Sequence, residues 1–154
     1  IGPKFGKSAQ QVAARIKDMT GAEITTMEQN GSVQLTSGEQ TWTVAVDDVD
    51  AISKELATTL FRIFQGTLTN VARHAEATAV KVRLRQAENE LCLQVADNGK
   101  GITLKQIEDP QSFGIMGIRE RANLWNGSVQ ITGKARRGTT VTVRIPLPEE
   151  YTPS

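Results

Sequence analysis

Apolar positions recur with helical spacing in three parts of the chain. They fall three and four residues apart within residues 8–19, over a longer stretch at about 47–75, and within IRERANLW, residues 118–125. We therefore predict three helices, each of which buries one apolar side. Asp47 and Asp48 are expected to cap the long helix, because carboxylates accept hydrogen bonds from the free N–H groups of a first turn.

The long helix carries a polar cluster opposite its apolar stripe. Gly66, Asn70 and Arg73 project from one side at about 100° per residue, with His74 beside them. Such a helix can line a ligand pocket, but any surface helix shows the same pattern, and the spacing alone favours a surface helix. The stripe on the other side consists of Phe61, Phe64, Leu68 and Val71.

Alternation of apolar and polar residues predicts the strands. Turn dipeptides at Asn30-Gly31 and Ser37-Gly38 indicate a small antiparallel ribbon, residues 28–46, at the edge of the domain. We expect an α+β fold, with helices on one face of a mixed and mainly antiparallel sheet. The predicted strands are 24–27, SVQLT (32–36), TWTVAV (41–46), AVKVRLR (79–85), ELCLQVAD (90–97), SVQIT (128–132) and TTVTVRI (139–145).

Three short motifs carry candidate chemistry. Asp97 ends a strand and opens DNGKG, where a carboxylate can accept a hydrogen bond from an exocyclic amine and glycines let the backbone approach a flat ligand. GIMG, residues 114–117, precedes the helix predicted to start at Ile118, and a loop of this kind offers N–H groups to phosphate. GT at 138–139 opens the last strand. Each motif also occurs as an ordinary turn or helix start.

Composition narrows the class of protein. The chain has 154 residues and a net charge of +1, which suits one domain and argues against a dedicated nucleic-acid binder. Cys92 is the single cysteine, so we expect a reducing compartment and no intramolecular disulfide. No apolar run is long enough to cross a bilayer. Because the chain starts at Ile1, we expect a fragment of a longer protein, with residues 1–7 a linker or cloning scar and residues 148–154 a frayed tail.

Four motifs follow one another along the chain, and their order indicates a family: LFRIFQGTLTNVARHAEATAVKV, DNGKGI, FGIMGIRERA and GTTVTVRIPLP. In this order they resemble the ATP-binding catalytic domain of sensor histidine kinases, a Bergerat-type fold shared with DNA gyrase and Hsp90. The resemblance covers roughly residues 50–147 and is specific to the branch that signals to LuxR/NarL-type response regulators. It implies a two-layer sandwich over residues 8–147, with a mobile ATP lid at about 103–116.

The resemblance implies a role for each matching residue. Asn70 would coordinate a Mg²⁺ ion that bridges the phosphates, with Arg73 and His74 near the phosphate chain. Asp97 would read the adenine amino group, and Thr139 would place a hydroxyl beside it. The remaining nucleotide-site positions are Gly99 and Gly101, which would make room for the base, Ile102, Ile115, the lid hinges Gly114 and Gly117, and Ile118, which would start the helix aimed at phosphate.

Two departures from the family pattern bear on activity. The family's phosphate acceptor is a histidine on a preceding dimerisation helix, whereas the only histidine here is His74. We therefore expect a monomeric catalytic domain, cytoplasmic or the cytoplasmic part of a membrane-anchored sensor, that meets its phosphoacceptor helices and response regulator elsewhere. Gly66 stands where this branch normally has a glutamate, which could polarise a water or orient the attacking group. No catalytic residue is therefore assigned.

Gly66 leaves two interpretations open. The first is a protein-histidine kinase domain that transfers the γ-phosphoryl group of ATP to a histidine on a separate dimerisation domain. The alternative is a nucleotide-binding sensing or regulatory module with weak or no kinase activity, because glycine cannot replace a carboxylate. A third possibility, an ATPase or a serine kinase on the same fold, is disfavoured by RHA at 73–75 and by GIRERA.

Overall fold

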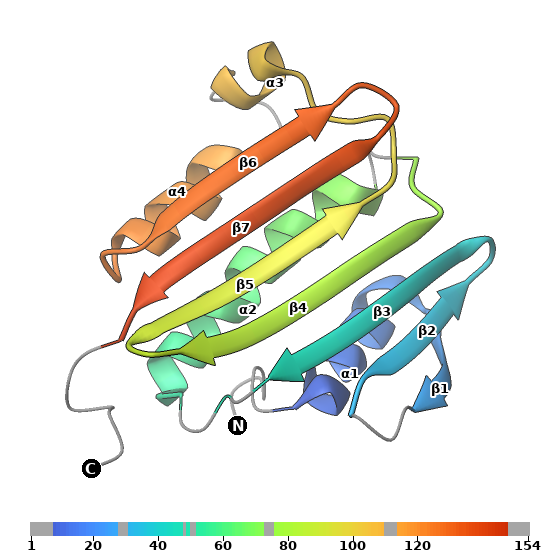
Figure 1. Ribbon diagram of the computed structural model, residues 1–154, viewed down its shortest axis with the longest axis horizontal. Coiled ribbons are helices and arrows are strands. Elements are labelled where there is room, and N and C mark those ends of the chain that lie inside the picture. The colour runs from blue at the N-terminus through green and yellow to red at the C-terminus, as the bar shows by residue number, and fades with distance from the viewer. Residues whose placement is uncertain are drawn as a thin grey trace.

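One mixed β-sheet with helices on one face organises the chain (Figure 1). The computed structural model describes residues 8–27, 31–47, 49, 52–72, 76–109 and 114–147. The helices are α1 (Ala9–Thr20), α2 (Lys54–Asn70), α3 (Leu104–Glu108) and α4 (Ile115–Asn123). The strands are β1 (Glu23–Met27), β2 (Val33–Ser37), β3 (Gln40–Asp47), β4 (Ala79–Ala87), β5 (Glu90–Asp97), β6 (Ser128–Lys134) and β7 (Gly138–Pro146).

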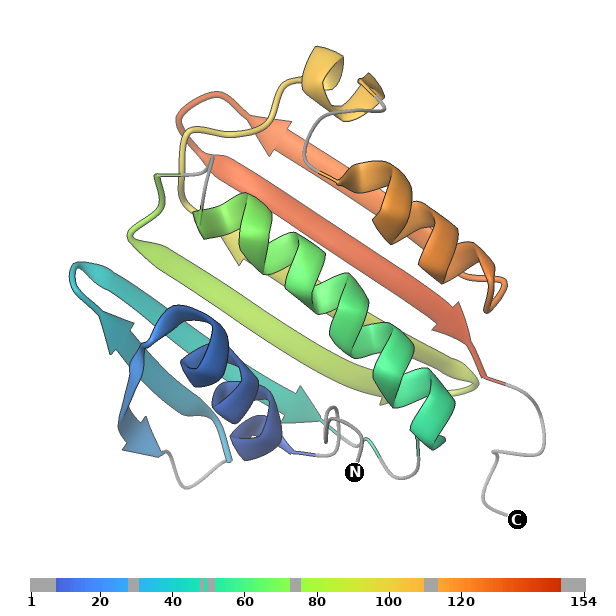
Figure 2. The ribbon, with the colours of Figure 1, turned by 180° about the vertical axis from the view of Figure 1, so that it is seen from behind.

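The described strands form a single sheet in the order β1-β2-β3-β4-β5-β7-β6. Among them, β3 and β4 pair in parallel, and every other neighbouring pair is antiparallel. Figure 2 shows α1, α2 and α4 side by side on one face of this sheet. The predicted α+β class, with a mixed and mainly antiparallel sheet, is confirmed.

The ribbon predicted at 28–46 continues into the main sheet. β1, β2 and β3 pair successively as antiparallel strands. β3 then lies parallel to β4, with Trp42 beside Val80 and Val44 beside Val82. A parallel neighbour requires a crossover, and α2 supplies it on the helical face. Residues 28–30 lie outside the described part of the chain.

The start of α2 differs from the prediction. Its N-cap is Ser53, whose Oγ accepts a hydrogen bond from the backbone N–H three residues on, at 3.1 Å. The prediction that Asp47 caps this helix is wrong, because the backbone there still belongs to the β3–β4 ladder. The Asp47 carboxylate instead forms an ion pair with Arg83, 2.8 Å from its guanidinium. Asp48 lies outside the described residues.

The start of α4 also differs. The helix expected at 118–125 begins at Ile115, with Gly114 as its N-cap at a φ of 61°. Gly117 and Ile118 therefore lie inside the helix rather than before it. The glycines at 114 and 117 indicated a loop at this point, although Ile115, Ile118 and Ala122 are buried at helical spacing.

The segment expected to be an ATP lid, at about 103–116, contains a short helix, α3. Its first turn is closed by a capping box: the Thr103 hydroxyl accepts from the backbone of Gln106, and the Gln106 side chain accepts from the backbone of Thr103. Residues 110–113 lie outside the described part of the chain. The mobility expected of this segment stays a prediction.

α2 is buried over a different arc from the predicted stripe. The side chains it buries are Leu56, Leu60, Ile63, Phe64, Thr67 and Leu68, followed by Val71. Phe61 is only partly buried. Gly66 therefore does not lie opposite the core: it is half-buried and faces Ile118 of α4. α2 has the core on one side and a second helix on the other.

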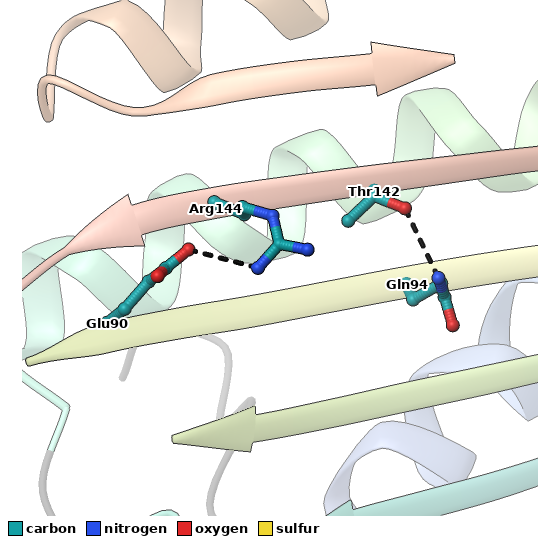
Figure 3. A network of polar contacts seen from close by, with 4 residues as sticks. All are labelled: Glu90, Gln94, Thr142 and Arg144. Carbon is teal, nitrogen blue, oxygen red and sulfur yellow. Dashed lines mark hydrogen bonds and ion pairs between the residues drawn. The ribbon is translucent and has the colours of Figure 1, made fainter. Parts of the chain in front are cut away.

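The face of the sheet without helices is polar. Along β4, Val80, Val82 and Leu84 are buried on the helical side, while the residues between them are exposed. On the open face Arg144 donates to Glu90 at 3.3 Å and Gln94 donates to Thr142 at 3.3 Å (Figure 3). The apolar core lies on the helical side, so a ligand pocket lined by core residues must open there or at the ends of the strands.

Candidate functional site

A pocket lies between α2 and α4 at the end of the sheet where β5 stops and β7 starts. It encloses about 550 Å³, counting the space at its mouth. Seven of the residues that the sequence assigned to nucleotide binding line it: Asn70, Asp97, Gly101, Ile102, Ile115, Ile118 and Thr139. They come from four separate segments of the chain, so the fold brings together residues that are far apart in the sequence.

Asp97 is held at the end of β5 by two backbone donors. Its Oδ1 accepts a hydrogen bond from Gly99 N at 2.8 Å and from Thr139 N at 3.3 Å. Both bonds go to the same oxygen. In the described part of the chain no donor is bound to Oδ2, so this oxygen can accept a hydrogen bond from a ligand in the pocket.

Thr139 joins β7 to the loop after β5. Its Oγ1 accepts a hydrogen bond from Ile102 N at 2.8 Å, while its own N–H binds Asp97. The start of β7, the end of β5 and the loop at 99–102 are thereby tied together. The Thr139 hydroxyl accepts from the backbone in this structure, and its predicted place beside the base and Asp97 stays a prediction.

Two glycines allow these segments to approach one another. Gly101 has a φ of 84°, and a Cβ there would overlap the carbonyl oxygen of Lys134, the last residue of β6. Gly138 has a φ of 102°, and a Cβ there would overlap the carbonyl oxygen of Asp97. The positive φ and the overlap with backbone mean that any other residue at these two positions would be strained. Gly101 therefore makes room first of all for the backbone at the end of β6.

Asn98 and Gly99 of DNGKG support the pocket without lining it, whereas Lys100 belongs to its wall. Asn98 accepts hydrogen bonds from the backbone N–H groups of Thr78 and Ala79, both at 2.9 Å, and so anchors the start of β4. Gly99 is buried and serves as a donor to Asp97 without lining the pocket. Lys100 lines the pocket. The motif is thus a structural junction as well as a pocket wall.

Asn70 is the last residue of α2, half-buried and on the pocket wall. Arg73 and His74, predicted to lie near phosphate, are outside the described residues, so their placement stays a prediction. In the described part of the chain no three His, Cys, Asp or Glu side chains come together in a way that could hold a metal ion.

The glycines at the start of α4 do not line the pocket, whereas Ile115 and Ile118 do. Because the helix begins at Ile115, the N–H groups without a helical partner belong to its first three residues. The Ile118 N–H already binds the Gly114 carbonyl at 3.2 Å. The prediction that Ile118 starts the helix is wrong. The N–H groups that could bind an anion lie one turn earlier, at the start of α4.

Several pocket residues were not predicted. They are Thr67, Val71, Val95, Lys100, Gln106, Ile131 and Val141. Strand alternation could have found two of them, because Val95 and Val141 lie two residues from Asp97 and Thr139 on the same face. Thr67 gave no such signal: it is buried and its hydroxyl donates to the Ile63 carbonyl at 3.0 Å.

A family model described as "Histidine kinase-, DNA gyrase B-, and HSP90-like ATPase" matches residues 55–149, which is most of the chain. The chain belongs to this ATPase family. The resemblance carried by the sequence motifs is thereby confirmed. All the residues described above as lining the pocket lie within the matched range.

Curated relatives of this family member are sensor kinases. The sensor histidine kinase LiaS of Bacillus subtilis (strain 168) is 40% identical over 101 residues, which are 65% of this chain and 28% of LiaS. The signal transduction histidine-protein kinase/phosphatase DegS of the same organism is 29% identical over 125 residues, 80% of this chain and 31% of DegS. The chain thus spans less than a third of the curated relatives it matches.

Solved structures support the fold of this family member. A blue-light activated histidine kinase of Erythrobacter litoralis EL346 matches with a TM-score of 0.65 at 20% identity, over 94% of this chain and 43% of that one. The Acinetobacter baumannii histidine kinase AdeS matches with a TM-score of 0.58 at 14% identity, over 70% and 55% of the two chains. No helix among the described residues is long and apolar enough to span a membrane.

The bond between Thr139 and Ile102 can be tested by substitution. Thr139→Val removes the acceptor at nearly constant volume, so the free energy of unfolding should fall by about 1 kcal/mol. Thr139→Ser keeps the hydroxyl and is the matched control. Urea denaturation measures both. Equal stability of the Val and Ser variants would show that this bond does not hold the junction together.

Proposed function

We propose that this domain binds ATP and transfers its γ-phosphoryl group to a histidine on a separate dimerisation domain of the parent protein. The observation that carries the proposal is the convergence of Asp97, Thr139 and Asn70 on one pocket within the region that matches the family. The names of the curated relatives favour a kinase over a nucleotide-sensing module without turnover.

The adenine would lie at the sheet end of the pocket. Asp97 Oδ2 would accept from the exocyclic amine while Oδ1 keeps its two backbone donors. Val95, Val141 and Ile131 supply an apolar wall on which a flat base can rest. Because the carboxylate is fixed by the backbone, little ordering would be needed on binding.

The phosphates would extend toward the helices. Asn70 offers an amide oxygen at the end of α2, and Mg²⁺ commonly uses one or two protein oxygens together with phosphates and water. The donor set therefore fits this ion, which when bound would neutralise charge on the phosphates. The first-turn N–H groups of α4 would donate to phosphate oxygens from the other side, and Arg73 and His74 are proposed to lie near the same phosphates.

Catalysis would depend on positioning and electrostatics rather than on a basic side chain of the domain. The imidazole nitrogen of the acceptor histidine would form a bond to the γ-phosphorus as the bond to the bridging oxygen of ADP breaks. Gly66 provides no carboxylate to orient that histidine, so the docked dimerisation domain would have to do so. The domain itself would be monomeric, on the cytoplasmic side of a parent that serves a LuxR/NarL-type response regulator.

Asp97→Asn should weaken Mg-ATP binding roughly 100-fold or more. The amide oxygen of Asn would keep accepting from Gly99 and Thr139, so its NH₂ would face the adenine amine, donor against donor. Isothermal calorimetry measures the loss. Glu90→Gln removes a carboxylate on the open face of the sheet and should leave the affinity unchanged. Undiminished binding by Asp97→Asn would rule out this adenine site.

Phosphotransfer is tested by mixing the domain with the phosphoacceptor domain of its parent and γ-labelled ATP. We expect acid-labile label on the phosphoacceptor domain that requires Mg²⁺ and is lost with Asp97→Asn. Binding of ATP without any transfer would contradict the kinase function and leave a sensing module. Failure to bind ATP at all would contradict both.

A further inference from the structure

Gly66 and Ile118 meet where α2 packs against α4. A Cβ built on Gly66 would lie 3.1 Å from Cγ1 and 3.3 Å from Cδ1 of Ile118. Carbon atoms in ordinary contact lie about 3.5–4.0 Å apart. Because position 66 has no side chain, Ile118 packs directly on the backbone of α2.

Ile118 borders the pocket on one side and is otherwise enclosed by its neighbours. Its side chain is only 1% exposed. The position of its Cγ1 is set by χ1, and a β-branched side chain in a helix strongly prefers one χ1 rotamer. A side chain at position 66 would therefore require Ile118, and with it the start of α4, to shift by a few tenths of an ångström.

Such a displacement would be greatest at the start of α4. Beyond the end of the helix, Trp125 Nε1 donates to Thr59 Oγ1 of α2 at 3.0 Å, and this bond ties the two helices together there. The first turn has no such bond in the described residues. The contact between Gly66 and Ile118 therefore helps to set the distance of that turn from α2.

The end of α2 and the start of α4 share one pocket. Asn70, Ile115 and Ile118 all line it, together with Thr67 beside Gly66. Asp97 and Thr139 belong to the sheet, so a change in the spacing of the helices would not move them. The spacing therefore acts on the helical end of the pocket alone.

We propose that Gly66 is a positioning residue for the triphosphate. Its missing side chain sets the spacing of α2 and α4 so that Asn70 and the first turn of α4 engage the same phosphates. This inference rests on the proposed function. It gives Gly66 a role of its own in ATP binding, distinct from the loss of a carboxylate at that position.

The test compares ATP with adenosine. Gly66→Ala should weaken Mg-ATP binding roughly fivefold and change adenosine binding by less than about twofold, because a small displacement affects only the phosphate contacts. Calorimetry measures Mg-ATP, and NMR titration measures adenosine. Thr69→Ala, an exposed position at the same end of α2, is the control and should change neither affinity. Alanine is the better helix former, so a loss of affinity cannot come from a weakened helix.

A double-mutant cycle tests whether the contact itself is the cause. Ile118→Ala removes both crowded atoms, so Gly66→Ala should lose most of its effect on Mg-ATP binding in that background. An unchanged effect there would overturn the proposal. So would unaltered ATP affinity in Gly66→Ala, or an equal loss for ATP and adenosine. If the unmodified domain binds neither Mg-ATP nor adenosine, the proposed function is wrong, and so is this inference, which rests on it.

Discussion

The hydrogen bonds that Asp97 accepts from Gly99 and Thr139 hold together the part of the molecule on which the pocket depends. They join the end of β5 to the start of β7, and Thr139 extends the junction to the loop at Ile102. A buried or half-buried carboxylate needs such donors, because its charge is otherwise costly away from water. The same bonds leave the second carboxylate oxygen of this pocket-lining residue without a donor in the described part of the chain, so one side chain can meet a structural requirement and serve as a binding group.

The helical end of the pocket follows from a different constraint. α2 and α4 approach each other closely because Gly66 has no side chain in the path of Ile118. A glutamate at position 66, which the resemblance leads one to expect, could not be added here without moving Ile118 or the helix that carries it. The chain therefore has no carboxylate at this position, and Ile118 packs against the backbone of α2 there.

Much of the fold could be predicted because local patterns of apolar and polar residues indicate its helices and strands. The alternation in AVKVRLR and ELCLQVAD corresponds to β4 and β5, whose apolar residues are buried on one side. The parallel pairing of β3 with β4 could not be predicted, since it depends on a crossover through α2 rather than on any local signal. The aspartates before α2 failed as a cap signal because strand pairing extended the chain through Asp47.

Some features of the candidate site could be predicted from the sequence and others could not, because only some of them depend on local motifs. Asp97, Asn70 and Thr139 stand in motifs that can be recognised from the sequence, and the fold places them around one pocket. The contact between Gly66 and Ile118 joins residues on two helices that only packing brings together. The start of α4 at Ile115 was missed because the glycines at 114 and 117 indicated a loop, although Ile115 and Ile118 are both buried three residues apart.

A crystal structure of the domain with Mg²⁺ and a non-hydrolysable ATP analogue tests the central claim most directly. The account predicts the adenine amine within about 2.7–3.2 Å of Asp97 Oδ2, with the phosphates between Asn70 and the first turn of α4. Adenine bound outside the pocket, or an amine with no contact to Asp97, would contradict it.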